Sequence, residues 1–257
     1  MKNVYIFIIF FQISLIAASQ NNQILVEYQV IKGNITNKET LIATNEKALY
    51  ITDSLLIENE NNVNITEIDE YNNEIILAQK TIKLYATTYY MKQDENLIYF
   101  TQVFNGVYSV VKDSLPDFKW DLKSIETKKI GSFMCKKATL NFRGSKIVAW
   151  YSEELSVPFG PWKFKGLPGL ILELYNLDDT SIHHWRAKKI IYPHQKDIQF
   201  TKDNQLNIIE YETVIADMET QIKEKMKRME SRVPKGVTVS GSKLNRTGIE
   251  KKYEWEK

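Results

Sequence analysis

Short runs in which apolar and polar residues alternate recur along most of this chain, and local turns separate them. In residues 23–31 every second side chain is apolar, which places on one face Ile24, Val26, Tyr28 and Val30. Asn105-Gly106 lies between two further runs and is typical of a two-residue hairpin turn. Strands at such short intervals predict a curved antiparallel meander sheet.

The period changes after residue 205. Apolar side chains there recur at spacings of three and four, at Tyr211, Ile215, Met218, Ile222, Met226 and Met229. This pattern predicts one long amphipathic C-terminal helix over residues 206–228. Its apolar face could bind a partner or a membrane surface, but we expect it to pack on the sheet. The fold class is therefore mainly β with one helix (α+β).

The first 19 residues have the features of a secretory signal peptide. Lys2 supplies the positive end, residues 4–16 are mostly apolar, and Ala17-Ala18-Ser19 provides small residues for cleavage. The apolar run is short for a membrane span, and no later stretch approaches that length. We expect cleavage near Ser19-Gln20. The mature protein should be periplasmic, in the outer envelope or secreted, and not an integral membrane protein.

The rest of the chain divides into a single domain, residues 20–230, and a polar tail, residues 231–257. The tail has seven Lys and Arg against three Glu, so we expect it to be poorly ordered. The formal net charge of the whole chain is +2. That balance gives no basis for nucleic-acid binding, which requires a strongly basic patch.

No catalytic, metal-binding or cofactor motif is present in the sequence. Cys135 is the only cysteine, which excludes an internal disulfide. It could be a nucleophile or a redox thiol, but no neighbour would lower its pKa, so we expect a small buried residue. His183 and His184 are adjacent on a predicted strand, so they face opposite ways and cannot bind one metal together. We therefore predict no catalytic site, no metal site and no cofactor.

Residues 160–172 contain the densest set of residues that constrain local structure. Trp162-Lys163-Phe164-Lys165 alternates rings and charges, so in extended geometry both rings would face one way. Pro168-Gly169 fits a type II turn, with Gly169 at positive φ. The run 170–175 then predicts a buried strand.

Gly166-Leu167-Pro168-Gly169-Leu170-Ile171 is, letter for letter, the hexapeptide that gives the GLPGLI family its name. The flanking landmarks also resemble that family: Gly160-Pro161, Ala149-Trp150-Tyr151, Lys128-Lys129-Ile130-Gly131 and Cys135-Lys136-Lys137-Ala138. The resemblance implies a secreted or envelope protein of Bacteroidota-type Gram-negative bacteria. It implies no established activity and provides no catalytic residues.

The connection over residues 152–169 is long and carries many apolar side chains, which must cover an apolar surface. Candidate lid or binding residues are Trp162, Phe164, Phe159 and Trp150. Trp162 and Phe164 could form the underside of a lid over a cavity, or they could simply complete the core. A curved sheet with such a loop over its concave face resembles the half-barrels of periplasmic lipoprotein carriers, at the level of fold only.

Three functions fit these features. The first is a non-enzymatic binding module whose concave face, under the 152–169 loop, takes an apolar small molecule, a lipid or an envelope protein. The second is a secreted hydrolase with scattered catalytic residues. The third is an accessory to an outer-membrane import complex.

Overall fold

The computed structural model describes residues 23–52, 63–68, 75–80, 86–177, 182–194, 207–232, 246 and 248–256. The signal peptide expected at residues 1–19 lies outside the described residues. The strands in the first half are β1 (Gln23–Lys32), β2 (Ile35–Ala43), β3 (Lys47–Thr52), β4 (Val63–Ile68), β5 (Ile75–Lys80), β6 (Thr88–Lys92), β7 (Leu97–Phe104) and β8 (Val107–Ser114). They are followed by β9 (Thr127–Ile130), β10 (Phe133–Phe142), β11 (Ser145–Ser152), β12 (Leu170–Asn176), β13 (His183–His194), β14 (Ile208–Glu210) and the helix α1 (Tyr211–Glu230).

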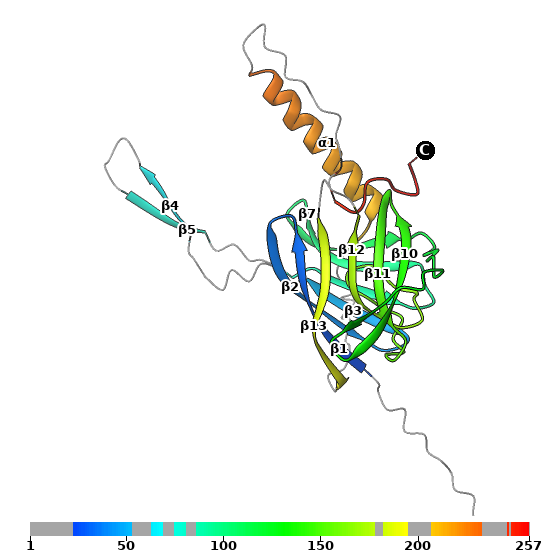
Figure 1. Cartoon of the computed structure of the whole chain (residues 1–257). Coiled ribbons are helices and arrows are strands. Elements are labelled where there is room, and N and C mark those ends of the chain that lie inside the picture. The colour runs from blue at the N-terminus through cyan, green and yellow to red at the C-terminus, as the bar shows by residue number, and fades with distance from the viewer. Residues whose placement is uncertain are drawn as a thin grey trace, which may run out of the picture.

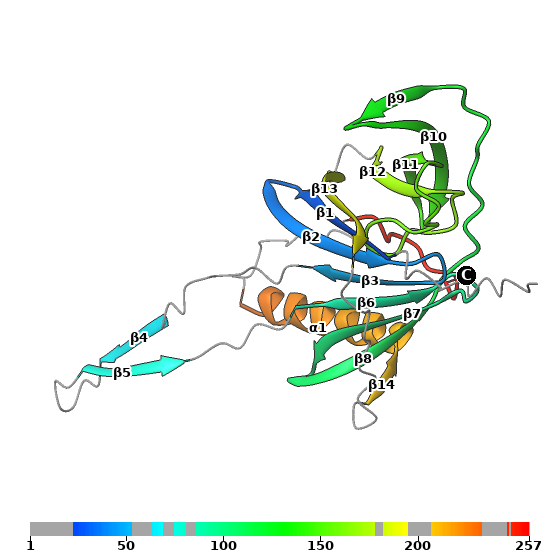
Figure 2. The ribbon, with the colours of Figure 1, turned by 90° about the horizontal axis from the view of Figure 1, so that it is seen from below.

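Twelve of the described strands form one sheet, in the order β14-β8-β7-β6-β3-β2-β1-β13-β12-β11-β10-β9. It consists of two antiparallel meanders, one from β1 to β8 and one from β9 to β13, which are joined where β1 pairs with β13. Figure 2 shows how the sheet curls between these halves. Strands β4 and β5 form a separate hairpin within the first meander. The sequence prediction of a mainly β fold with a curved meander sheet and one helix is confirmed.

Local sequence explains much of this pattern. The alternating side chains Ile24, Val26, Tyr28 and Val30 of β1 are all fully buried. At the β7–β8 turn, Asn105 and Gly106 have φ of 48° and 80°, as a type I′ hairpin turn requires. One departure is β14, which was not predicted and which pairs with β8 in parallel.

The core lies on the inner face of the curved sheet, and the connection between β11 and β12 fills part of it. Phe159, Phe164 and Leu167 of that connection are at most 1% exposed. Backbone bonds tie it to the start of β12, because Leu170 N–H donates to Leu155 O at 3.0 Å and Ile171 N–H to Phe159 O at 3.1 Å. The loop therefore does cover an apolar surface, as its composition predicts.

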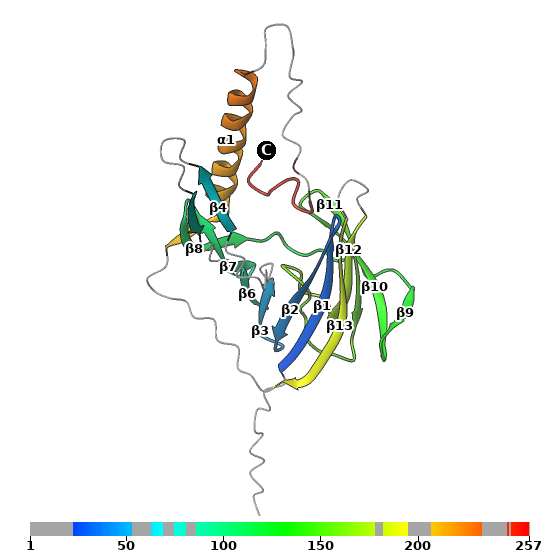
Figure 3. The same cartoon turned by 90° about the vertical axis from the view of Figure 1, so that its left-hand side faces the viewer.

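The helix packs on the sheet only at its beginning. Val214 is fully buried, but Met218 and Ile222 are 48% and 40% exposed. Beyond its first turns α1 extends past the ends of the strands (Figures 1 and 3). Our expectation that the helix packs on the sheet is therefore confirmed only for its first turns. In the part of the chain that is described, no helix is both long and apolar enough to cross a membrane.

The end of the chain also differs from the poorly ordered tail that its composition suggested. Residues 248–256, called here the C-terminal segment, pack between α1 and the β10–β11 turn (Figure 1). Ile249 and Tyr253 are 3% and 5% exposed, and the backbone N–H groups of Lys251 and Lys252 donate to Arg143 O. The basic composition of this stretch does not indicate that its apolar residues Ile249 and Tyr253 pack in the core. Residues 233–245 lie outside the described residues.

Candidate functional site

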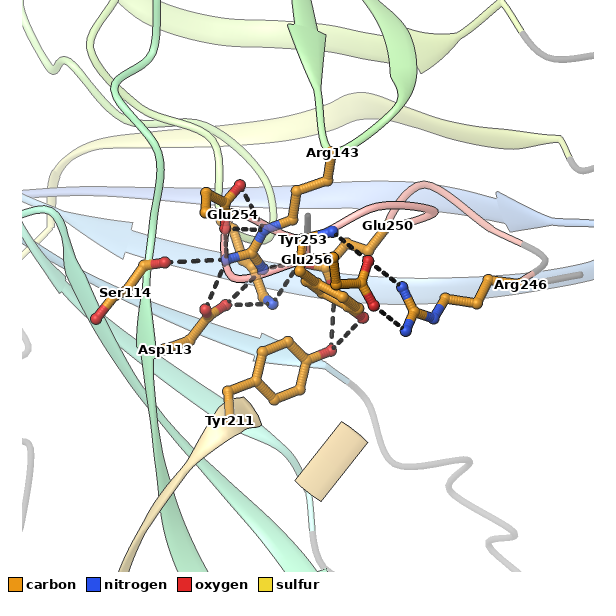
Figure 4. A network of polar contacts seen from close by, with 10 residues as sticks. Asp113, Ser114, Arg143, Tyr211, Arg246, Glu250, Tyr253, Glu254 and Glu256 are labelled. Carbon is orange, nitrogen blue, oxygen red and sulfur yellow. Dashed lines mark hydrogen bonds and ion pairs between the residues drawn. The ribbon is translucent and has the colours of Figure 1, made fainter. Parts of the chain in front are cut away.

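A buried network of charges holds the C-terminal segment against the sheet (Figure 4). Its centre is Arg143, in the β10–β11 turn, whose guanidinium binds both oxygens of Asp113 at 2.7 and 3.0 Å. The same guanidinium pairs with Glu250 and, at 2.9 Å, with Glu254. Arg143 and Asp113 have fully buried side chains. Since an unpaired buried charge costs several kcal/mol, each member of the network depends on its partners.

Lys163 completes the network from the 152–169 connection. Its Nζ donates to Asp113 Oδ2 at 2.7 Å and to Glu250 Oε1 at 2.8 Å. The hydroxyl of Tyr211, the first residue of α1, donates to the other oxygen of Glu250 at 2.9 Å. Five separate parts of the chain therefore meet at one point: β8, the β10–β11 turn, the β11–β12 connection, α1 and the C-terminal segment.

Burial and charge oppose each other in shifting the pKa of Arg143, and act in the same direction on the pKa of Tyr211. Burial alone would lower the pKa of Arg143, but its hydrogen bonds with Asp113 and the charge of Glu250 outweigh that effect and raise it. Burial raises the pKa of Tyr211 well above its usual range, and the charge of Glu250 adds to the rise. Arg143 therefore stays charged and Tyr211 keeps its hydroxyl proton at neutral pH, which suits a structural anchor.

Beside the network lies an open cleft with a volume of about 550 Å³. The inner face of the sheet forms its floor, and α1 and the C-terminal segment form its walls. Its apolar lining is Trp162, Trp185, Tyr211, Ile215, Met218, Ile222, Ile249 and Tyr253. Its polar lining is Lys32, Gln102, His183, Glu219, Arg246 and Glu250. The half-exposed stripe of α1 thus faces a hollow in the molecule.

Trp162 has an unusual conformation in this cleft. Its φ is 57°, in the left-handed region that a bulky side chain rarely adopts. A turn holds it there, since Phe164 N–H donates to Pro161 O at 3.2 Å. Its ring stacks on Trp185 with centroids 6.1 Å apart and planes 7° from parallel. Backbone strain of this kind concentrates at functional sites, so Trp162 is a candidate binding residue.

The structure separates the four residues that sequence analysis grouped as candidate lid or binding residues. Trp162 lines the cleft, whereas Phe159 and Phe164 are fully buried in the core. Trp150 pairs with Glu173, on the face of the sheet opposite Trp185. Phe164 completes the core, and of these two rings only Trp162 reaches the cleft. The prediction that both rings form the underside of one lid is therefore wrong.

The extended geometry expected for residues 162–165 is also wrong, because Trp162 and Lys163 lie within a turn that runs from Pro161 to Phe164. Both lysines point inward: Lys163 joins the charge network, and Lys165, 2% exposed, donates to the carbonyls of Lys92, Gln93 and Glu95. Burial lowers the pKa of Lys165. These lysines tie the connection to the β6–β7 turn and to β8, which the alternating pattern alone could not reveal.

The glycines of the GLPGLI hexapeptide have structural roles that differ from the expected ones. Gly169 does not have a positive φ, so the prediction of a type II turn is wrong. Gly166 does have a positive φ, of 90°. A Cβ on Gly169 would lie 2.1 Å from the carbonyl oxygen of Ser152. Gly169 is therefore required for a close approach of two backbones. The remaining hexapeptide residues Leu167, Leu170 and Ile171 are buried, and Pro168 is exposed.

The cysteine and the adjacent histidines do not form a reactive or metal-binding site among the described residues. Desolvation raises the pKa of Cys135 to about 11, so the thiol stays protonated, as expected of a buried residue. His184 lies 2.8 Å from Glu173, while His183 lines the cleft, so the two rings do face opposite ways. Among the described residues, no group of three or more His, Cys, Asp and Glu is placed to hold a metal ion.

The residues that close the site from the C-terminal side were not predicted from local sequence patterns. Glu250, Tyr253 and Arg246 lie in the segment that we took for a tail. Arg246 pairs with Glu219 of α1 and with Glu256 and so joins the two walls of the cleft. The local signal for packing was the set of apolar positions Ile249, Tyr253 and Trp255 within a polar stretch.

Comparison with known proteins supports the fold. Residues 141–173 match a family model described as "Protein of unknown function (Porph_ging)". This match includes the hexapeptide and is consistent with the GLPGLI-type resemblance. No curated protein matches the sequence.

Among solved structures, PNGF-II in two crystal forms resembles this chain with a TM-score of 0.50 and 18% identity. The likeness covers 74% of this chain but only 31% of the PNGF-II chain, and at this identity it shows the fold alone. LprF from Mycobacterium bovis matches with a TM-score of 0.28 and 9% identity, over 71% of this chain and 90% of LprF. That score is too low to indicate a common fold.

Proposed function

We propose that this protein is a non-enzymatic binding module of the bacterial envelope, of GLPGLI type, that holds an apolar molecule or the apolar part of a partner in the cleft. The observation that carries the proposal is the cleft itself. Its volume of about 550 Å³ lies within the range of roughly 300–1,000 Å³ that is usual for small-molecule sites. Trp162, which is held at positive φ, lines the cleft.

The lining favours binding over catalysis. The two carboxylates that reach the cleft are already engaged, Glu219 by Arg246 and Glu250 by Arg143, Lys163 and Tyr211. Cys135 does not line the cleft, and its raised pKa disfavours a thiolate nucleophile. No observation favours the alternative of a secreted hydrolase, and none points to an import complex. An apolar surface whose carboxylates are already paired is suited to holding a ligand unchanged.

The half-exposed stripe of α1 supports the same proposal. Met218 and Ile222 are about half exposed although they belong to the apolar face of the helix. Exposed apolar side chains that line a hollow usually mark a binding surface. A ligand that filled the cleft would remove both from water and would contact Trp162 and Tyr211 as well.

A titration of the mature chain with an uncharged fluorescent probe that carries a dodecyl chain tests this function. We expect saturable binding. Ile222→Ser should weaken it about tenfold, since the lost contact with several carbons is worth ~1–2 kcal/mol. Ile125→Ser is the matched control, because Ile125 is 95% exposed and lies away from the cleft. Absence of saturable binding to wild type, or equal affinities of the two variants, would refute the proposal.

Trp162 and Phe164 provide a second comparison. Trp162→Ala should weaken probe binding, because the ring lines the cleft. Phe164→Ala should instead lower the free energy of unfolding by ~3–5 kcal/mol, as for other buried rings. If Trp162→Ala binds the probe as wild type does, the strained tryptophan is not part of the site.

A further inference from the structure

We infer that the ligand of the cleft is amphipathic and carries an anionic group, a carboxylate or a phosphate, which Lys32 binds. This inference rests on the proposed function and adds the chemistry of the ligand's polar end.

Lys32 occupies a corner of the cleft where the sheet ends. It is the last residue of β1 and pairs across strands with His183, the first residue of β13; both line the cleft. Its ammonium lies 5.8 Å from the centre of the Trp185 ring, and Trp185 forms part of the floor. A ligand whose apolar body lay over Trp185 and along α1 would bring its polar end to this corner.

The lysine has hydrogen-bonding capacity to spare. Its Nζ has three donors and makes one hydrogen bond within the described part of the chain, to Glu39 Oε1 at 2.7 Å, and its side chain is 36% exposed. Glu39 does not depend on Lys32 alone, because Tyr50 and Trp185 donate to its other oxygen. Lys32 can therefore bind a second anion without leaving Glu39 unsatisfied.

Arg246, the other cation of the cleft, differs in this respect. Its two terminal nitrogens already bond Glu219, both oxygens of Glu256 and the carbonyl of Lys251. It serves to join the walls of the cleft. Lys32 is thus the better-placed cation for a ligand.

A cationic ligand fits less well. Glu219 and Glu250 are paired with cations of the protein, as described above. The aromatic rings of the lining also have protein cations beside them, Lys163 at 4.9 Å from Trp162 and Arg246 at 4.7 Å from Tyr253. A second positive charge at these rings would meet like-charge repulsion.

The test displaces the uncharged dodecyl probe from the mature chain with four competitors of equal chain length: dodecanoate, dodecyl phosphate, dodecanol and dodecylammonium. We expect at least one anion to bind about tenfold more tightly than dodecanol, as a charge-assisted hydrogen bond would provide, and dodecylammonium to bind no better than dodecanol. The stronger of the two anions distinguishes a fatty-acid head from a phosphate head.

Three variants locate the effect. Lys32→Gln should abolish the preference for the anion, and Lys32→Arg should keep it. Lys38→Gln is the matched control, because Lys38 makes a similar ion pair with Glu27 at 3.0 Å away from the cleft. It should bind all four competitors as wild type does.

The outcomes separate the two proposals. If wild type does not bind the probe, the proposed function fails and this inference fails with it. If the probe binds but dodecanol displaces it as well as both anions, or dodecylammonium does so better, the binding function stands and the anionic ligand is refuted. If Lys32→Gln does not fold, the competitor series on wild type and on Lys32→Arg still decides.

Discussion

Gly169→Ala should be one of the most destabilising single-methyl substitutions in this chain. A Cβ at this position would lie 2.1 Å from the carbonyl oxygen of Ser152, 2.6 Å from its carbonyl carbon and 2.9 Å from Glu153 Cα. All three atoms belong to the backbone, so no side chain can rotate away. Because ordinary contacts are ~3.5–4.0 Å, the two backbone segments must separate by roughly 1 Å or more.

The magnitude follows from two contributions. Overpacking of this kind costs ~1–3 kcal/mol. Separation would also weaken the backbone bonds that tie the connection to β12, Leu170 N–H to Leu155 O and Ile171 N–H to Phe159 O, at ~1 kcal/mol each. The expected loss in free energy of unfolding is therefore ~3–5 kcal/mol.

Urea unfolding of the mature chain measures this loss, with Gly131→Ala as the control. Gly131 has φ of 60° and nothing within 4 Å of its hypothetical Cβ, so an alanine there should cost only the backbone strain, ~1–2 kcal/mol. A loss at Gly169 equal to or below the loss at Gly131 would show that the close approach does not constrain this position.

Four further outcomes are expected. Arg143→Met should lower the free energy of unfolding by ~3–5 kcal/mol, because Asp113 stays buried with one cation fewer, and urea unfolding measures this. Burial opposes ionisation of Glu173, but its bonds with His184 and Lys128 lower its pKa to about 2 from 4.5. The ionised group therefore stabilises the fold above pH 4.5 and loses this effect as the pH falls towards 2. The melting temperature of Glu173→Gln should therefore be lower than that of wild type at pH 6 and approach it near pH 2. Since burial raises the pKa of Cys135 to about 11, a thiol reagent at pH 8 should label it far more slowly in folded than in urea-unfolded protein. Mass analysis of periplasmic protein should show a chain that begins near Gln20, and an intact Met1 would contradict the signal peptide.

Local patterns predicted most of the sheet. Alternation located β1, and the Asn105-Gly106 turn located the β7–β8 hairpin, because period and turn chemistry are properties of a few consecutive residues. The pairing of β1 with β13 joins residues more than 140 positions apart and leaves no local signal. The same is true of β14, whose three residues are too few to show a period.

The candidate site was harder to predict than the fold. Trp162 could be identified by its ring and its place in a long apolar loop. The partners of Lys163 could not, since Asp113 and Glu250 lie 50 and 87 positions away. An alternating Trp-Lys-Phe-Lys sequence suggests exposed lysines, and only distant carboxylates and carbonyls make their burial possible. The C-terminal segment was missed for the same reason: Glu250 and Glu254 pair with Arg143, which lies 107 and 111 positions away in the turn between β10 and β11.

These observations divide the chain between residues that build the fold and residues that shape the cleft. The hexapeptide belongs to the first group, because Gly166 supplies a positive φ, Gly169 permits a close backbone approach, and Leu170 and Ile171 are buried. The cleft instead depends on α1, on the C-terminal segment and on Lys32, all outside the motif. A chain that kept the hexapeptide but changed the stripe on α1 would keep the connection and the sheet, yet present a different surface to a ligand. The motif therefore indicates the architecture of the protein, whereas the binding that we propose depends on the cleft residues.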